Sequence, residues 1–271
     1  MSQETQGNDM TKRRILYHLP GVDAVAIRRD VEYKTTDAGA LTLDVYRPPD
    51  SESDARIPAV VFVNGFPDPG MVQFFGCRLK DMGSYISWGE LTAASGVAAI
   101  TYTTGMDPAG DLHALLQYIR ENAADLGIDG NRIGVWACSG NVPNALSVLM
   151  REDRDFVKCA VLCYGLMLDL DGSTDVADAA GIWGFANPCA GKSFADLAQD
   201  IPMFIVRAGR DETPHLNETL DRFLNRAVSS NLPITFVNHP TAPHSFDMLH
   251  DSETTRGIIR QILAFMRLHL L

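Results

Sequence analysis

Ser139 is the residue whose surroundings point most directly to chemistry. It follows an apolar run at residues 133–137 that is typical of a buried strand, and a helical pattern begins soon after it. A sharp strand-to-helix turn exposes a serine as a nucleophile, and it requires small residues two positions before and after that serine. Ala137 is small, and Asn141, although larger than the usual glycine, tolerates unusual backbone angles. The pattern is a relaxed form of the nucleophile elbow.

Two further polar residues could activate this serine. Asp211 follows the apolar run at 202–206, and His244 follows the run at 234–237. A histidine can remove the hydroxyl proton of a serine, and a carboxylate then fixes the tautomer and stabilises the charge of the histidine. Ligands bind beyond the carboxyl ends of parallel strands. Three residues at three strand ends, in the order Ser139, Asp211, His244, therefore predict a catalytic triad.

Backbone N–H groups are expected to stabilise the oxyanion that such an attack creates. One should come from Gly140, directly after the serine, and the other from the loop that follows the run at 57–63. Phe66 is the preferred second donor, because Gly65 lets the chain turn close to the substrate and Pro67 has no N–H. The predicted substrate pocket is lined by Gly65, Cys138 and Trp183.

The elements around these residues predict an α/β fold. Segments with helical spacing of apolar residues alternate with runs that are apolar throughout, which favours a mostly parallel sheet with helices on both faces. Residues 25–36 and 41–47 instead predict an antiparallel hairpin at the N-terminal side of the sheet. Asp111 is available as the N-cap of one helix and Ser252 as the N-cap of the last. The expected buried strands are 57–63, 97–102, 133–137, 157–164, 202–206 and 234–237.

The length of 271 residues is ordinary for one α/β domain with an insertion. Residues 1–15 are polar, lack the apolar core of a signal peptide and are expected to be a disordered tail. Residues 16–271 then form a single domain. Within it, residues 168–200 interrupt the alternation of strands and helices and are rich in Asp, Gly and Ala. This segment is a candidate cap over the site.

Composition excludes several classes of protein. A net charge of −11 argues against nucleic acid and against anionic membranes as partners. No apolar run approaches the ~20 residues of a membrane span, and five irregularly spaced cysteines indicate neither a disulfide framework nor a zinc site. No phosphate-binding glycine loop or cluster of metal ligands occurs, so no cofactor and no metal are expected. These features favour a cytoplasmic protein.

Residues 25–271 resemble the dienelactone hydrolase and esterase type of α/β-hydrolase. The resemblance lies in residues 41–48, in residues 126–139 up to the serine, and in the histidine loop at 242–247. It implies an α/β-hydrolase fold with a small cap, a small-molecule ester or lactone substrate, an acyl-enzyme intermediate and, as in many relatives, a homodimer. The chain departs from the family pattern at Asn64, Ala137 and Asn141.

Two alternatives remain open at this point. Dienelactone hydrolases use cysteine at the elbow, so Cys138 is a rival nucleophile; that register places the bulky Trp136 two residues before it and Gly140 two residues after it. The second alternative is a catalytically silent α/β-hydrolase scaffold that binds a ligand or partner. A displaced His244 would favour that interpretation.

Overall fold

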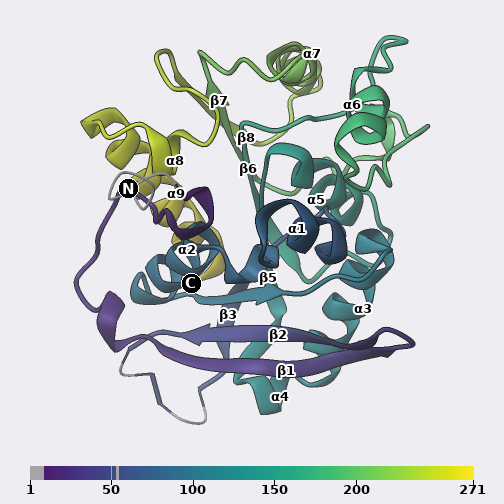
Figure 1. Cartoon of the computed structure of the whole chain (residues 1–271). Coiled ribbons are helices and arrows are strands. Elements are labelled where there is room, and N and C mark those ends of the chain that lie inside the picture. The colour runs from purple at the N-terminus through teal and green to yellow at the C-terminus, as the bar shows by residue number, and fades with distance from the viewer. Residues whose placement is uncertain (1–8, 50, 53–54) are drawn as a thin grey trace, which may run out of the picture.

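The computed structural model describes residues 9–49, 51–52 and 55–271 (Figure 1). Within them the strands form one twisted sheet in the order β1-β2-β4-β3-β5-β6-β7-β8. β1 and β2 pair antiparallel, β2 pairs antiparallel with β4, and the remaining neighbours are parallel. The strands are β1 (Ala26–Thr36), β2 (Gly39–Arg47), β3 (Ile57–Phe62), β4 (Ala98–Tyr102), β5 (Ile128–Cys138), β6 (Val157–Cys163), β7 (Met203–Ala208) and β8 (Ile234–His239).

The predicted mostly parallel sheet with an N-terminal antiparallel hairpin is thus confirmed. The central strands explain why their sequences are apolar throughout: every residue of β3 and of β4 is buried. A strand that is covered by helices on both faces has no solvent side, so the alternation of apolar and polar residues disappears.

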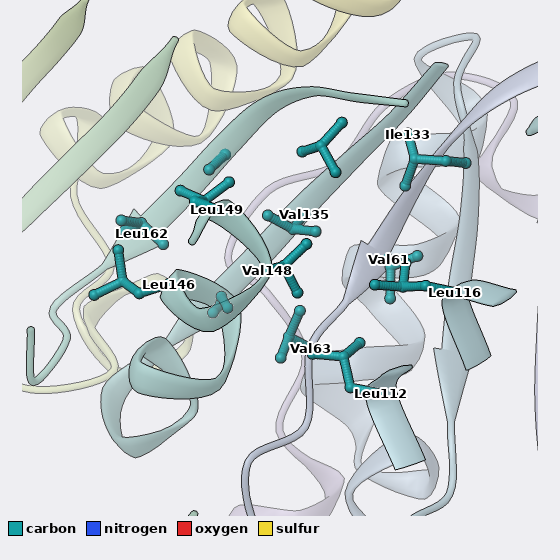
Figure 2. Packing of buried hydrophobic residues seen from close by; sticks show 14 of the residues in the cluster. Val61, Val63, Leu112, Leu116, Ile133, Val135, Leu146, Val148, Leu149 and Leu162 are labelled. Carbon is teal, nitrogen blue, oxygen red and sulfur yellow. The ribbon is translucent and has the colours of Figure 1, made fainter. Parts of the chain in front are cut away.

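Helices cover both faces of the sheet, as predicted. α2 and α9 pack on one face and α3, α5 and α7 on the other, and Figure 1 shows α2 and α9 on the opposite side of the central strands from α3 and α5. In Figure 2, Val61 and Val135 of the sheet meet Leu116 of α3 and Val148 of α5. The helices are α1 (Asp68–Phe75), α2 (Gly83–Ala94), α3 (Pro108–Glu121), α4 (Ala123–Leu126), α5 (Val142–Leu149), α6 (Asp175–Trp183), α7 (Leu216–Ser229), α8 (Phe246–Leu249) and α9 (Glu253–Leu270).

The helix α2 was not predicted from the sequence. Eight of its residues are buried, including polar Ser84 and Ser87, so it has no polar face from which a helical period could be recognised. Trp88 lies at its centre and packs against Trp136 of β5 with ring centroids 5.3 Å apart. This helix carries Tyr85, which reaches the candidate site.

The predicted N-cap of α3 is wrong by one turn. Asp107 is the N-cap, and its side chain accepts a hydrogen bond from the N–H of Gly110 at 3.1 Å. Asp111 lies inside the helix and binds Lys34 and the N–H of Gly105 instead. Pro108 begins the helix, where its missing N–H has no helical partner to lose. Ser252 caps α9 as expected.

Part of the expected N-terminal tail belongs to the folded body. A short 3₁₀ turn spans Met10–Lys12, and Ile15 is buried with its N–H bonded to Ser87 of α2 at 2.9 Å. Residues 1–8 of that expected tail lie outside the described residues. Residues 168–200 contain α6 and a short 3₁₀ turn at Phe194–Asp196. Of the helices described, none is both long and apolar enough to cross a membrane.

Candidate active site

Ser139 occupies a strained turn between β5 and α5. Its φ is 57°, in the left-handed region of backbone conformation, which residues other than glycine adopt at a cost of about 1–3 kcal/mol. Cys138, one residue earlier, is ordinary extended backbone with φ −136° and ψ 156°. Ser139–Asn141 form a single 3₁₀ turn, and Pro143 lies in the first turn of α5. The turn therefore places the serine, and not the cysteine, at its apex.

His244 and Asp211 form a direct pair at the adjacent strand ends. The Nδ1 of His244 lies 2.7 Å from Oδ2 of Asp211, and the Asp211 side chain is fully buried. Burial raises the pKa of Asp211, but the hydrogen bond and charge of His244 and the N–H of Thr213 at 3.0 Å outweigh it, so the pKa is lowered overall. The carboxylate therefore stays ionised and can hold the imidazole in one orientation.

Tyr164 lies at the strand end next to Ser139 and contacts the histidine. β5 and β6 pair in register from Cys138 to Cys163, so Ser139 and Tyr164 leave the sheet side by side. The Tyr164 ring in turn lies edge-on against His244, with centroids 5.1 Å apart. The predicted serine, acid and histidine thus emerge at the same end of the sheet.

Gly140 lies beneath two aromatic rings. A Cβ built at position 140 would lie 2.7 Å from Cδ1 of Phe185 and 2.9 Å from Cζ of Phe66, so a side chain has no room there. The two rings also pack edge to face, with their centroids 5.8 Å apart. Phe185 follows α6 and comes from the predicted cap segment, which therefore reaches the residue beside the serine.

The N–H of Phe66, which we expected to be an oxyanion donor, has a partner in its own loop. It donates to Oδ1 of Asn64 at 2.9 Å, a local turn closed by the asparagine side chain. Nδ2 of Asn64 donates in turn to Thr104 at 3.2 Å and to Asp68 at 3.3 Å. The loop after β3 is therefore held by a buried hydrogen-bond network. Asn64, where the sequence departs from the family pattern, makes three of these hydrogen bonds, so the departure marks the network in the sequence.

Asn141 joins this loop to the elbow. Its Oδ1 accepts the N–H of Gly65 at 2.7 Å, and its Nδ2 donates to the carbonyl of Cys138 at 3.0 Å and to the hydroxyl of Tyr85 at 3.2 Å. The residue is buried. From the sequence it was recognised only as an unusual residue at the second glycine position of the elbow.

The remaining predicted pocket residues differ in their surroundings. Gly65 contacts the elbow, because a Cβ there would lie 3.0 Å from the carbonyl oxygen of Gly140. Burial, followed by the charge of Asp247, raises the pKa of the Cys138 thiol to about 12. Trp183 is 60% exposed at the end of α6, whereas Phe185 is buried against Phe66. Phe185 is thus the aromatic residue of this segment that contacts the elbow.

Asp247 forms a second buried carboxylate close to the histidine. It accepts hydrogen bonds from Nε1 of Trp88 and from the hydroxyl of Tyr164, both at 2.8 Å. Burial raises its pKa despite these donors. Its bonds join α8, which follows the histidine loop, to α2 and to the end of β6. Among the described residues, no group of three or more His, Cys, Asp or Glu side chains could hold a metal ion.

Comparison with known proteins yields structural relatives only. No protein-family model matches the chain, and no curated protein matches its sequence. A thermophilic esterase of the planctomycete Thermogutta terrifontis, esterase 2, matches in structure with a TM-score of 0.65 at 20% identity, over 92% of this chain and 93% of that one. This chain has the α/β-hydrolase fold.

Further structures of that esterase match the fold equally well. Its butyrate-bound form has a TM-score of 0.63 at 19% identity, over 93% of this chain and 97% of that one. A form phosphonylated by sarin has a TM-score of 0.65 at 18% identity, over 92% and 96% of the two chains. At this level of identity the structural similarity shows the fold of this chain, whereas its chemistry depends on its own site residues.

Proposed function

We propose that this protein is a serine hydrolase that cleaves carboxylic esters or lactones of small molecules. The single observation that carries the proposal is the buried Asp211 carboxylate paired at 2.7 Å with His244, at the sheet end where Ser139 occupies a strained turn. Left-handed backbone is costly for a serine and is concentrated at functional sites, and a serine held in such a turn between a strand and a helix, at the same sheet end as an acid–base pair, is the arrangement of an activated nucleophile.

In this mechanism the Oγ of Ser139 attacks the ester carbonyl while His244 takes its proton. Asp211 stabilises the resulting imidazolium, and His244 returns the proton to the departing alcohol. The acyl-enzyme is then hydrolysed by a water that His244 activates. The lowered pKa of Asp211 keeps this acid ionised throughout, as the role requires.

The oxyanion is assigned to the N–H groups of Gly140 and Phe66. The N–H of Phe66 donates to Oδ1 of Asn64, so a substrate oxygen in the hole would share or replace that acceptor. The rings of Phe66 and Phe185 lie over Gly140 and would form an apolar wall for the acyl group, with Gly65, Cys138 and Trp183 as further predicted pocket residues. Esterase 2 of T. terrifontis has been captured with butyrate and with propionate, which supports short acyl chains as the first substrates to test.

The rival nucleophile Cys138 receives no such support. A thiol with a pKa of about 12 carries almost no thiolate near neutral pH, and the thiolate is the reactive form. The cytoplasmic location and the homodimer stay predictions.

The proposal is tested by hydrolysis of p-nitrophenyl butyrate by wild type, Ser139→Ala and the matched control Cys138→Ala. We expect Ser139→Ala to lose at least ~10³-fold in kcat, because the triad acts as one unit, while Cys138→Ala retains activity within about threefold of wild type. A fluorophosphonate should add one adduct to wild type, at Ser139. Loss of activity only in Cys138→Ala would move the nucleophile. An inactive wild type that the fluorophosphonate does not label would indicate the silent scaffold.

A further inference from the structure

Asn141 links three segments that are distant in sequence. Its side chain bonds the elbow through the carbonyl of Cys138, the loop after β3 through the N–H of Gly65, and α2 through the hydroxyl of Tyr85. Both Nδ2 hydrogens and one lone pair of Oδ1 have partners, so this buried amide is well satisfied.

Backbone geometry does not dictate an asparagine at this position. Asn141 has φ −82° and ψ −15°, an ordinary helical conformation that any residue adopts. Neither strain nor a need for glycine therefore explains the residue type. What distinguishes asparagine here is the hydrogen bonding of its side chain, which alanine or glycine would lack.

The carbonyl of Gly65 is held as firmly as its N–H. It accepts the N–H of Ala186, from the segment after α6, at 2.7 Å. The carbonyl of Gly65 and the N–H of Phe66 belong to one peptide plane and point in opposite directions, because the peptide is planar and trans. Asn141 on one side of Gly65 and Ala186 on the other thus fix the direction of the Phe66 N–H.

We propose that Asn141 is a positioning residue that sets the geometry of the oxyanion hole by holding Gly65 against the elbow. The close approach of the two segments agrees with this role, since a Cβ at Gly65 would lie 3.0 Å from Cα of Asn141. The side chain of Asn141 accepts the N–H of Gly65. The N–H of Phe66, whose partner is the side chain of Asn64 in its own loop, is the donor whose direction the contacts at Gly65 fix. The inference rests on the proposed function, because it assigns a role within the same site.

The test compares Asn141→Ala with Tyr85→Phe. Alanine removes the bond to Gly65 together with both Nδ2 bonds, whereas Tyr85→Phe removes one Nδ2 partner and leaves the bond to Gly65. Removal of a direct oxyanion donor costs ~10²–10³-fold in kcat, so displacement of one should cost about 10- to 100-fold. We expect that loss in kcat for Asn141→Ala, with KM within about threefold of wild type, and kcat within about twofold for Tyr85→Phe.

An aryl trifluoromethyl ketone gives a readout that a merely structural role would not change. Attack of Ser139 forms a C–O bond and breaks the π bond of the carbonyl while the serine proton passes to His244, which leaves a hemiketal oxyanion that must occupy the same hole. Its Ki should rise by the same factor by which kcat falls in Asn141→Ala. Thermal unfolding of both variants, measured alongside, reports how much of any effect is loss of stability.

Two results would overturn the inference, and they are distinguishable. If Asn141→Ala unfolds at a lower temperature but keeps wild-type kcat and ketone affinity, Asn141 has a structural role only and the proposed function stands. If wild type neither hydrolyses p-nitrophenyl butyrate nor reacts with the fluorophosphonate at Ser139, the proposed function fails and this inference fails with it.

Discussion

Two buried carboxyl groups near His244 differ in what they face, and the difference explains why their pKa values shift in opposite directions. Asp211, after β7, faces the imidazole and a backbone N–H, and its pKa is lowered. Asp247, in α8, faces the hydroxyl of Tyr164 and the indole of Trp88, and its pKa is raised. Burial raises the pKa in both cases. The partners decide the outcome: the hydrogen bond and charge of His244 repay the desolvation of Asp211, whereas two neutral donors do not repay that of Asp247.

The comparison assigns different roles to the two regions. The loop after β7 supplies a charge that the proposed mechanism uses, whereas Asp247 of α8 supplies an anchor that joins the histidine loop to α2 and β6 through two hydrogen bonds from neutral donors. Without a cationic partner, a buried carboxylate keeps a raised pKa, since a buried charge is costly. The two sites should therefore differ in how much activity a substitution removes, and their contributions to stability should change with pH in opposite senses.

The largest expected effect comes from Asp211→Asn. The amide keeps the shape of the side chain but cannot stabilise the imidazolium, and it favours the wrong tautomer of His244. We expect kcat for p-nitrophenyl butyrate to fall by about 10⁴-fold with a much smaller change in KM. Asp247→Asn is the matched control, with a loss in kcat of no more than about tenfold. Equal losses in the two variants would remove the distinction between the two carboxylates.

A moderate effect is expected in the pH dependence of stability. The raised pKa of Asp247 means that the folded protein binds more protons than the unfolded chain above the ordinary value of 3.8, so the free energy of unfolding falls as pH rises from there to the folded pKa. The lowered pKa of Asp211 acts in the opposite sense. Its contribution is present above 3.8 and is lost as pH falls through the folded pKa.

Urea denaturation between roughly pH 3 and 7 measures both dependences. Asp247→Asn should flatten the decline with rising pH, and Asp211→Asn should remove part of the loss in acid. A wild-type profile that Asp247→Asn leaves unchanged would contradict a raised pKa of Asp247.

The smallest effect is expected at Cys138, which directly precedes the serine. Burial and the charge of Asp247 raise its pKa to about 12, so it should be unreactive toward iodoacetamide at neutral pH, while Cys77, whose thiol is less deeply enclosed, reacts first. Peptide mass spectrometry after partial alkylation, with activity followed in parallel, checks this. Activity that disappears in proportion to alkylation of Cys138 would restore the cysteine hypothesis.

Much of the fold could be read from the order of apolar runs. β3 and β4 are apolar because helices cover both of their faces, and that burial leaves a mark in the sequence itself. The sequence of α2 shows no helical period of apolar residues, since most of its residues are buried and these include the polar Ser84 and Ser87. The N-cap of α3 was misplaced because Asp107 and Asp111 both precede apolar residues, and only the fold engages Asp111 with Lys34.

By itself, the sequence determined the sheet, the strand ends and the positions of Ser139, Asp211 and His244 along the chain, because hydrophobic periodicity and turn residues act locally. Only the tertiary structure decided which N–H groups already have partners, which two aromatic rings lie over Gly140 and which carboxylate faces the imidazole. These depend on contacts between residues dozens to more than a hundred positions apart, such as Gly65 with Asn141 and Trp88 with Asp247. No local pattern specifies such pairs, since each is set by how the elements pack.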